Sequence, residues 1–331
     1  MTDRRLDVLA IGNAIVDVIA DADDAFLERS GMHKGAMRLI DEAEADRLYS
    51  AMGPARELSG GSAANTVAGL ASLGLKAGFI GQLADDQLGA IFTHDIRSLG
   101  VEFATPLRSD VGATARCLIV VTPDAQRTMN TFLGAAQELD AQVVDPAHVA
   151  QASILYLEGY LWDPEAPRQA MYKAMDAARQ AGTKVAFTLS DGFVVDRHRD
   201  GLWDLFREGR IDILFANEAE IMSLAQHESA EEAALAVAAE VATVVVTRGE
   251  QGAFALSRGE RAAVPAERIA KLVDTTGAGD LFAAGFLAGE ARSLGLEQSL
   301  KLGAICAAEV IQHYGARPEA DLRTLARDLL A

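Results

Sequence analysis

Short apolar runs alternate with longer amphipathic segments along most of the chain. Each run has the length of a buried strand, and the segments between them repeat their apolar residues at helical spacing. Strands are predicted at residues 6–12, 76–81, 153–157, 183–189, 211–215 and 243–247; helices are predicted at 42–51, 60–73, 86–99, 164–181, 201–209, as a pair across 218–240, and at 296–314. Strands that alternate with helices predict an α/β fold with a doubly wound, mainly parallel sheet and helices on both faces.

Other segments have a different pattern and predict a second, smaller sheet. Residues 13–20 extend the first strand with alternating apolar positions, and residues 26–40 suggest short antiparallel strands. Residues 115–121 and 128–133 are β-rich, and the turn Pro123-Asp124-Ala125-Gln126 between them predicts a hairpin. We therefore expect one domain over residues 1–331, with a small β-sheet lid formed by segments of about 14–40 and 102–133.

Composition and charge limit the partners. The chain has 331 residues, 50% hydrophobic and 24% charged, as in soluble globular proteins. It has no apolar run of about eighteen residues, so no membrane partner is expected. Its two cysteines fit a reducing cytoplasm. The formal net charge of −18 argues against a nucleic-acid partner, and an anionic ligand would need a local cradle and a metal ion.

The stretch Asp274-Thr275-Thr276-Gly277-Ala278-Gly279-Asp280 is the strongest candidate for chemistry, because a glycine loop here opens an apolar helix. The free N–H groups of a helix start, together with its dipole, favour an anion. Asp280 in the first turn would be a carboxylate base beside a transferring phosphate, and the helix start predicts that it is readily ionised. A simple N-cap before a packed helix explains the same residues equally well.

Two further patterns suit a ligand with neighbouring hydroxyls. Asn13 and Asp17 lie four apart after the first strand, on one face if the strand continues; a solvent-facing Asp17 is the alternative. In Gly60-Gly61-Ser62-Ala63-Ala64-Asn65, the glycines would let a ligand approach the backbone, and Asn65 lies one turn into the helix. A helix start capped by Ser62 is the alternative there.

Polar residues also follow two later strands. Asn217 and Glu220 would share a helix face that suits hydrated Mg²⁺ or a triphosphate, and a helix cap at Asn217 is the alternative. The turn Thr247-Arg248-Gly249-Glu250-Gln251-Gly252 could seat a nucleotide or could simply be a tight turn. Arg127, at the edge of the hairpin, could neutralise phosphate, although a lone arginine is more often structural.

Several known signatures are absent from the sequence. There is no P-loop, no Gly-x-Gly-x-x-Gly after the first strand, no serine elbow and no zinc-binding His-Glu-x-x-His. These absences argue against P-loop enzymes, dehydrogenases, α/β-hydrolases and zinc proteases.

Taken together, the four motifs at 60–65, 217–220, 247–249 and 274–280 resemble those of the ribokinase-like (PfkB) carbohydrate kinases, in the same order along nearly the whole chain. Within that family, Gly12-Asn13-Ala14-Ile15-Val16-Asp17, Phe187-Thr188-Leu189-Ser190 and Asp212-Ile213-Leu214-Phe215-Ala216-Asn217-Glu218 are most similar to the adenosine kinase branch.

The resemblance implies a role for each matching residue. It implies Asp280 as catalytic base, an anion hole made by Gly277, Ala278 and Gly279, and Arg127 as a lid arginine over the phosphate. It implies that Asn13, Asp17, Gly61, Ser62 and Asn65 bind the substrate and that Asn217, Thr247, Gly249 and Gly252 bind ATP. It further implies that Glu220 holds Mg²⁺ through water and that Asp274 and Thr276 belong to a monovalent-cation site, with the need for K⁺ left open. A homodimer formed through the lid is also left open.

We therefore expect an ATP-dependent kinase for the 5′-hydroxyl of a purine nucleoside, with adenosine the first candidate. Met37, Leu39, Leu133, Tyr160, Leu161 and Trp162 would form an apolar slot for the base. Met37 stands where many adenosine kinases have glutamine, so inosine, guanosine and plain sugars stay open as acceptors. A sugar kinase of the same family and a non-catalytic binding protein on the same scaffold are the alternatives.

Overall fold

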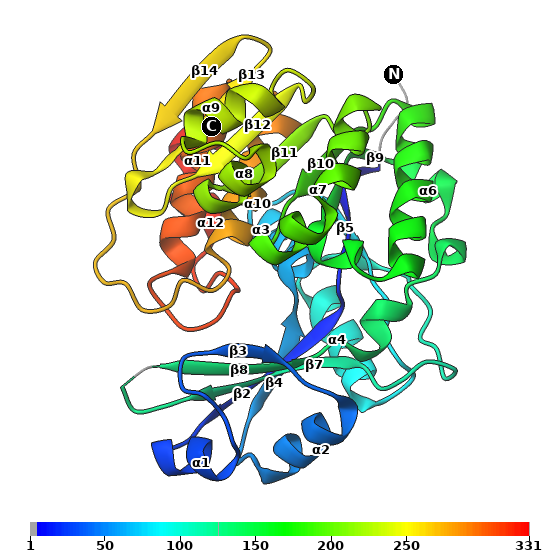
Figure 1. Cartoon of the computed structure of the whole chain (residues 1–331), viewed down its shortest axis with the longest axis vertical. Coiled ribbons are helices and arrows are strands. Elements are labelled where there is room, and N and C mark those ends of the chain that lie inside the picture. The colour runs from blue at the N-terminus through cyan, green and yellow to red at the C-terminus, as the bar shows by residue number, and fades with distance from the viewer. Residues whose placement is uncertain (1–4, 125, 331) are drawn as a thin grey trace.

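The computed structural model describes residues 5–124 and 126–330. Within them, the main sheet has nine strands in the order β14-β13-β12-β11-β10-β9-β1-β5-β6 (Figure 1). The strands are β1 (Leu6–Ile11), β5 (Ala77–Ile80), β6 (Glu102–Phe103), β9 (Ala152–Glu158), β10 (Lys184–Thr188), β11 (Ile213–Asn217), β12 (Thr243–Thr247), β13 (Ala253–Ser257) and β14 (Glu260–Val264). They pair in parallel from β6 to β12, whereas the hairpin β13–β14 joins antiparallel. The predicted α/β fold with a mainly parallel sheet is confirmed.

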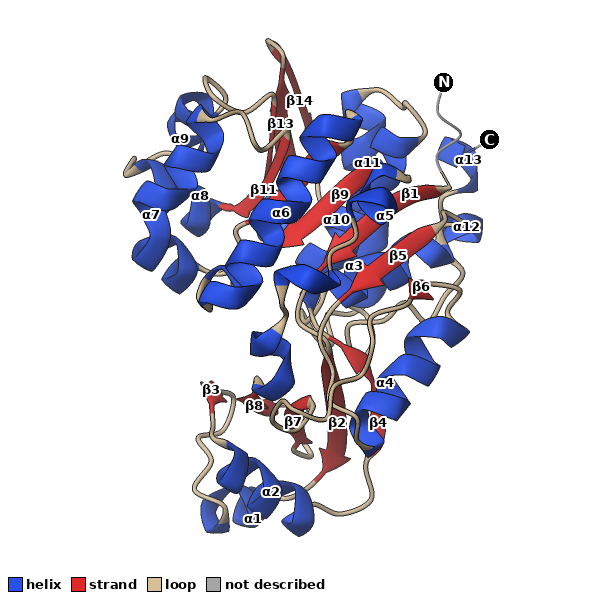
Figure 2. Cartoon of the chain, turned by 90° about the vertical axis from the view of Figure 1, so that its right-hand side faces the viewer, coloured by secondary structure: helices blue, strands red, loops and turns tan. Residues whose placement is uncertain are grey.

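Both faces of the main sheet are buried under helices (Figure 2). Alternate residues of β1 divide between two cores: Val8 and Ala10 enter one, and Leu9 and Ile11 the other. This alternation follows from the two-residue period of a strand. The first core takes residues from α3 (Ser62–Ser72), α4 (Gln87–Ser98), α10 (Ala278–Ala291) and α11 (Leu296–Val310); the second takes residues from α6 (Glu165–Ala181), α7 (Gly192–Arg207), α8 (Glu218–Ala225) and α9 (Ala230–Val237).

The small sheet lies beyond the carboxyl end of β1 and has five strands among the described residues, in the order β3-β8-β7-β2-β4 (Figure 1). They are β2 (Ile15–Asp21), β3 (Met37–Leu39), β4 (Arg56–Gly60), β7 (Ala115–Val121) and β8 (Arg127–Phe132). Val16, Val18, Leu118 and Val120 face the first core, with Leu48 of α2 (Glu42–Ala51). The alternate residues Ile15, Asp17, Cys117 and Ile119 face a cavity between the two sheets.

Part of the predicted small sheet is wrong. Residues 26–40 do not form antiparallel strands: α1 (Asp24–Arg29) begins at the N-cap Asp23, and β3 pairs in parallel with β8. A further strand, β4, lies outside the two predicted segments. The hairpin β7–β8 is confirmed, although Ala125 in its turn lies outside the described residues. The predicted helix at 201–209 is the second half of α7, which begins at Gly192 and kinks at His198.

The remaining short elements connect these layers. They are η1 (Gly134–Glu138), η2 (Ala141–Val143), α5 (Pro146–Ala150), η3 (Gly159–Trp162), η4 (Gly249–Gln251), α12 (Leu322–Leu325) and α13 (Arg327–Leu330). Across residues 5–124 and 126–330, no helix has the length and apolar character of a membrane span.

Candidate active site

A cavity of about 770 Å³ lies between the main sheet and the small sheet. Its walls come from the carboxyl ends of several main-sheet strands, the start of α3, the start of α10 and the inner face of the small sheet. Ligands of open parallel sheets bind beyond the carboxyl ends of the strands. The predicted residues that line it are Asn13, Asp17, Met37, Leu39, Gly61, Ser62, Asn65, Leu133, Asn217, Glu220, Thr247, Thr276, Gly277, Ala278, Gly279 and Asp280.

The glycine loop opens α10, as expected. Gly277 is the N-cap with φ of 79°, and a Cβ there would lie 2.7 Å from the Cβ of Ala316. Only glycine meets both conditions without strain. Gly279 has no such neighbour within 4 Å. The N–H of Ala278 donates to the carbonyl oxygen of Thr275 at 3.2 Å, and Gly279 and Asp280 follow it in the first turn of α10 at the cavity wall. The remaining N–H groups of a helix start favour an anion.

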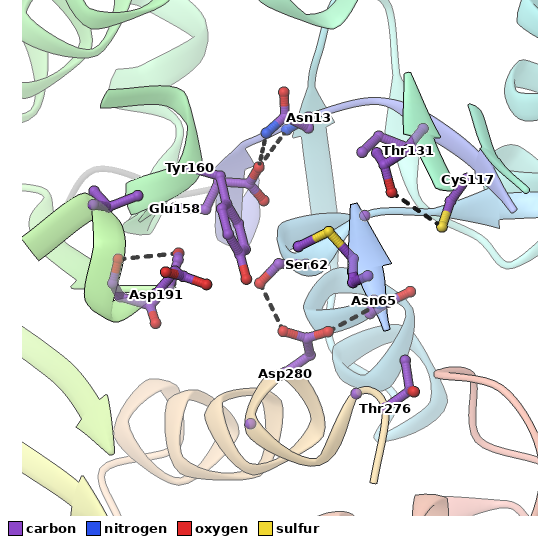
Figure 3. A pocket seen from close by; sticks show the side chains of 18 of the residues that line it. Asn13, Ser62, Asn65, Cys117, Thr131, Glu158, Tyr160, Asp191, Thr276 and Asp280 are labelled. Atoms are coloured by element: carbon purple, nitrogen blue, oxygen red, sulfur yellow. Dashed lines mark hydrogen bonds between the residues drawn. The ribbon is translucent and has the colours of Figure 1, made fainter. Parts of the chain in front are cut away.

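Asp280 lies within that first turn and is held by two side chains of α3 (Figure 3). Ser62 Oγ donates to Asp280 Oδ1 at 2.6 Å, and Asn65 Nδ2 donates to Oδ2 at 2.9 Å. Burial raises the pKa of Asp280, and these two hydrogen bonds offset only part of the rise. The prediction that Asp280 ionises readily is therefore wrong, because desolvation of its carboxylate outweighs the hydrogen bonds that favour the ionised form. Ser62 is also not the helix cap, because Gly61 is the N-cap of α3.

Asp17 projects into the cavity from β2 opposite the glycine pair. A Cβ on Gly60 would lie 2.4 Å from the Asp17 carboxylate, so glycine is required there for the carboxylate to fit. Gly61 has φ of 96°, and a Cβ there would lie 2.3 Å from the carbonyl oxygen of Asn13. Burial raises the pKa of Asp17 to about 6, while the charges of Arg317 and Arg127 act against the rise.

Asn13 lies before β2 begins, so it does not share a strand face with Asp17 as predicted, although both line the cavity. Glu158, which the sequence reasoning missed, fixes its position (Figure 3). Glu158 Oε1 accepts from the backbone N–H of Asn13 at 2.6 Å and from Asn13 Nδ2 at 2.8 Å, and Oε2 accepts from the N–H of Ala63 at 2.8 Å. Glu158 is fully buried, which raises its pKa to about 7.

Asn217 and Glu220 form a capping box at the start of α8. Asn217 Oδ1 accepts from the N–H of Glu220 at 2.9 Å, and the Glu220 carboxylate accepts from the N–H of Asn217 at 3.0 Å and from its Nδ2 at 2.8 Å. The capping alternative is therefore present, and both side chains still line the cavity. Burial raises the pKa of Glu220.

Thr247 lines the cavity, whereas Gly249 and Gly252 are not among its lining residues. Gly252 has φ of 85°, and a Cβ there would lie 2.1 Å from the carbonyl oxygen of Val264. Its structural role is the tight turn from β12 into β13.

Arg127 and Asp274 also lie outside the cavity lining, because they bind each other. Asp274 Oδ1 accepts from the N–H of Thr276 at 3.0 Å and from its Oγ1 at 2.7 Å, and Oδ2 accepts from the N–H of Gly315 at 3.0 Å as well as from Arg127. Burial opposes ionisation, but these bonds and the charge of Arg127 hold the pKa of Asp274 below its usual range. Its carboxylate is already neutralised, so this conformation does not fit a monovalent cation.

The apolar slot is partly as predicted. Met37, Leu39, Leu133 and Tyr160 line the cavity. Leu161 does not, because it is fully buried in the second core. Trp162 is buried there too, with its ring 5.4 Å from that of Tyr172 in α6. The predicted role of Leu161 is therefore wrong. Phe193, missed by the sequence reasoning, lines the cavity from the start of α7 and is 73% exposed.

The site offers little protein ligation for a magnesium ion. Among the described residues, no group of three or more His, Cys, Asp or Glu could hold a metal. Mg²⁺ in kinases is bound through one or two carboxylates, water and the substrate phosphates. Glu220 fits a contact through water, because each of its oxygens keeps a lone pair beyond the capping box.

Residues 7–322 match the family described as pfkB family carbohydrate kinase. The chain belongs to the pfkB family of carbohydrate kinases. The fold extends this likeness to solved structures: a probable sugar kinase from Rhizobium etli CFN 42 is 49% identical with a TM-score of 0.90, covering 98% of each chain. The adenosine kinase from Sinorhizobium meliloti is 48% identical with a TM-score of 0.89, covering 98% of this chain and 99% of its own. The 5-dehydro-2-deoxygluconokinase of Lacticaseibacillus casei is 27% identical over 95% of this chain and 92% of its own.

As a pfkB family kinase, the protein is a phosphotransferase that acts on a hydroxyl group. Kinases of this family use ATP, and Mg²⁺ is typical of them. The start of α10, with Asp280 in its first turn, lines the cavity between the two sheets.

Proposed function

We propose that this pfkB family kinase transfers the γ-phosphate of ATP to the primary 5′-hydroxyl of a purine nucleoside, with adenosine the first candidate. The observation that carries the proposal is the uneven chemistry of the cavity. The floor of the cavity is polar and is formed by Asn13, Asp17 and Asp280. Its mouth is formed by the exposed apolar side chains of Met37, Leu39 and Phe193.

The floor suits a ribose. Asp17 accepts hydrogen bonds when ionised, and Asn13 Oδ1 can accept as well. Gly61 lets the sugar approach the backbone where any side chain would clash with Asn13. This arrangement orients the sugar so that its primary hydroxyl faces Asp280.

Asp280 acts as the base in this proposal. The phosphoryl group passes through a loose transition state, so the protein mainly positions the reactants and stabilises charge. Asp280 takes the hydroxyl proton as the oxygen bonds to phosphorus, and its raised pKa brings it closer to the operating pH. The N–H groups of Gly277, Gly279 and Asp280 stabilise the transferring phosphate, while that of Ala278 donates to the carbonyl oxygen of Thr275 at 3.2 Å.

Nucleotide binding is assigned to the side of the cavity lined by Asn217 and Thr247. Glu220 would hold Mg²⁺ through water, and the ion would offset phosphate charge. Arg127 keeps its ion pair with Asp274 in this mechanism and does not reach the phosphate, so Asp274 and Thr276 do not bind a monovalent cation.

The mouth suits a purine rather than a bare sugar. Phe193, Met37 and Leu39 are 73%, 52% and 63% exposed and come from both sides of the opening, α7 and β3. Exposed apolar groups around a cavity mark a binding surface, and an aromatic face stacks on a base at a gain of about 1–3 kcal/mol.

A sugar kinase is the second candidate, because the polar floor alone would serve any sugar and the Rhizobium etli relative is named a probable sugar kinase. ADP release measured over adenosine, inosine, guanosine, ribose and fructose separates the two. The proposal requires the highest kcat/KM with a purine nucleoside. A higher value with ribose or fructose would overturn it.

A further inference from the structure

Arg317 braces the turn that carries the glycine pair. It lies in the segment after α11, and its guanidinium reaches across to two carbonyl groups on either side of that turn. Nε and Nη2 donate to the carbonyl oxygen of Ser59 at 3.0 and 2.6 Å, and Nη1 donates to that of Ala64 at 2.5 Å. Ser59 is the last residue but one of β4, and Ala64 lies in the first turn of α3. One side chain thus ties the small sheet to α3 across Gly60 and Gly61.

The charges of three carboxylates on three different elements act on the same guanidinium: Asp95 of α4, Asp17 of β2 and Asp280 of α10. Burial lowers the pKa of Arg317 to about 10, against the opposing effect of those three charges. Arg317 therefore remains protonated at neutral pH. Asp95, whose charge acts most strongly on Arg317, is itself held by the N–H and Oγ of Ser59 at 2.8 and 2.5 Å. The positive charge of Arg317 also acts on Asp17 and Asp280.

Other charges near these carboxylates do not replace it. Arg127 also acts on Asp17, but it binds Asp274 directly. Glu158 acts on Asp280 only as a further negative charge. For Asp280, Arg317 is the cation whose charge favours the ionised form.

We propose that Arg317 is a positioning residue of the kinase: it fixes the turn at Gly60 and Gly61 and supplies the positive charge that keeps Asp17 and Asp280 ionised around the acceptor hydroxyl. The inference rests on the proposed function, because it takes Asp280 as the base and Asp17 as a hydroxyl acceptor. Arg317 is not among the residues that line the cavity, and a merely structural brace would have no such effect on the charge of Asp17 and Asp280.

The test is the pH profile of kcat/KM with the best acceptor of the panel. Arg317→Met removes the charge, and Arg317→Lys keeps it while losing the forked contact with Ser59. The matched control is Arg292→Met, because Arg292 Nη2 likewise donates to a carbonyl of the α3 region, that of Leu73 at 3.0 Å, at the far end of the helix.

Losing the charge should raise the pKa of both carboxylates. The acid limb of the R317M profile should therefore move up by about one pH unit or more, a loss of about tenfold in kcat/KM at acidic pH beyond any loss at alkaline pH. In R317K the acid limb should stay at the wild-type pH while the KM for the acceptor rises. R292M should have the pH profile and the KM of the wild type.

If R317M lowers kcat/KM equally at every pH and leaves the acid limb at its wild-type position, Arg317 braces the turn without a charge role, and the inference is overturned. If R317M does not fold, R317K decides: an acid limb that moves up by about one unit although the charge is kept would equally overturn it. Failure of the proposed function looks different, since Asp280→Asn would then retain turnover whatever the Arg317 variants do.

Discussion

Arg127 at the start of β8 forms an ion pair with Asp274 in the loop that leads to α10, and the two side chains are 8% and 6% exposed. This contact joins the small sheet to the loop of the main domain that precedes α10. It also places a guanidinium where a monovalent cation would otherwise balance Asp274.

We expect the wild-type kinase to be nearly independent of K⁺. Replacing K⁺ by a large organic cation at fixed ionic strength should change kcat less than about twofold, because the buried carboxylate already has its counter-charge. Arg127→Met should make the rate depend on K⁺, since an uncompensated buried carboxylate remains. Adding Asp274→Asn to that variant should abolish the dependence. A strong K⁺ requirement in the wild type would contradict the prediction.

Asp280→Asn should lower kcat by at least about a hundredfold, the usual size of a general-base contribution. The amide keeps the shape and cannot take the hydroxyl proton. ATP affinity, measured by calorimetry, should stay nearly unchanged, because the backbone N–H groups are untouched. Ser62→Ala, which removes one of the two hydrogen bonds to Asp280, is the comparison and should cost less. Near-normal turnover in D280N would rule Asp280 out as the base.

Desolvation of Asp17 and Asp280 raises the pKa of both carboxyls, so activity should begin to fall at a higher pH than the ordinary pKa of an aspartate would give. Burial raises the pKa of Asp17 from 3.8 to about 6 and also raises that of Asp280. Both must be ionised, so kcat/KM should fall as the pH drops through about 6. Asp17→Asn should raise KM for the acceptor and make the acid limb less steep. A flat profile down to the pH range of an ordinary aspartate would contradict these pKa shifts.

Ionisation of Asp17 should lower the free energy of unfolding, although it raises activity. Asp17 has a folded-state pKa above its unfolded value, so its contribution is fully favourable below the unfolded pKa and is lost as the pH rises through the folded pKa. D17N removes this penalty. Relative to the wild type, D17N should gain up to about 3 kcal/mol in free energy of unfolding between acid and neutral pH, measured by urea denaturation at several pH values. A difference independent of pH would mean that Asp17 is not desolvated in the folded state.

The sequence predicted the elements whose signal is local. The apolar runs at β1, β9, β11 and β12 have the length and composition of buried parallel strands, and glycines with a following aspartate identified the start of α10. Residues 26–40 do not form the predicted antiparallel strands, because the side chain of Asp23 accepts from the N–H of Phe26 and starts a helix.

What the sequence could not show depends on contacts between distant segments. Glu158 binds Asn13 across 145 positions, and Arg317 binds Ser59 across 258; locally, each looks like any other charged residue. Asn217 and Glu220 are three positions apart, and this spacing is the same for a helix-capping box and for two residues that bind a ligand together. At 160–162 only the 3₁₀ turn of η3 decides that Tyr160 faces the cavity and Leu161 the core.

Phe193→Ala should distinguish a nucleoside site from a sugar site. Loss of an aromatic platform should cost about 1–3 kcal/mol of base binding, so KM for adenosine should rise at least about fivefold. KM for ribose should stay within about twofold, because the sugar lies on the polar floor. Leu235→Ala is the matched control: Leu235 is 61% exposed and is not among the cavity-lining residues. Equal effects of F193A on adenosine and ribose would count against a base at the mouth.

Gly279→Ala should separate the anion site from the fold. Gly279 lies in the first turn of α10, has no positive φ, and would place a Cβ with no neighbour within 4 Å. Alanine there should leave the free energy of unfolding unchanged or raise it by up to about 1 kcal/mol, because alanine is more favourable than glycine within a helix. Because Gly279 lines the cavity, its new methyl group would stand where phosphate has to approach the N–H groups.

The kinetic cost of Gly279→Ala should therefore be large although the protein is as stable as before. We expect KM for ATP to rise and kcat to fall so that kcat/KM drops at least about tenfold, because losing a preorganised N–H contact costs more than about 1.4 kcal/mol of transition-state stabilisation. Gly201→Ala in α7 is the control, since a Cβ there has only Trp162 Nε1 at 3.9 Å as a neighbour; it should gain similar stability and keep full activity. Wild-type kinetics in G279A would mean that the phosphate does not approach the start of α10, and the anion site would have to lie elsewhere in the cavity.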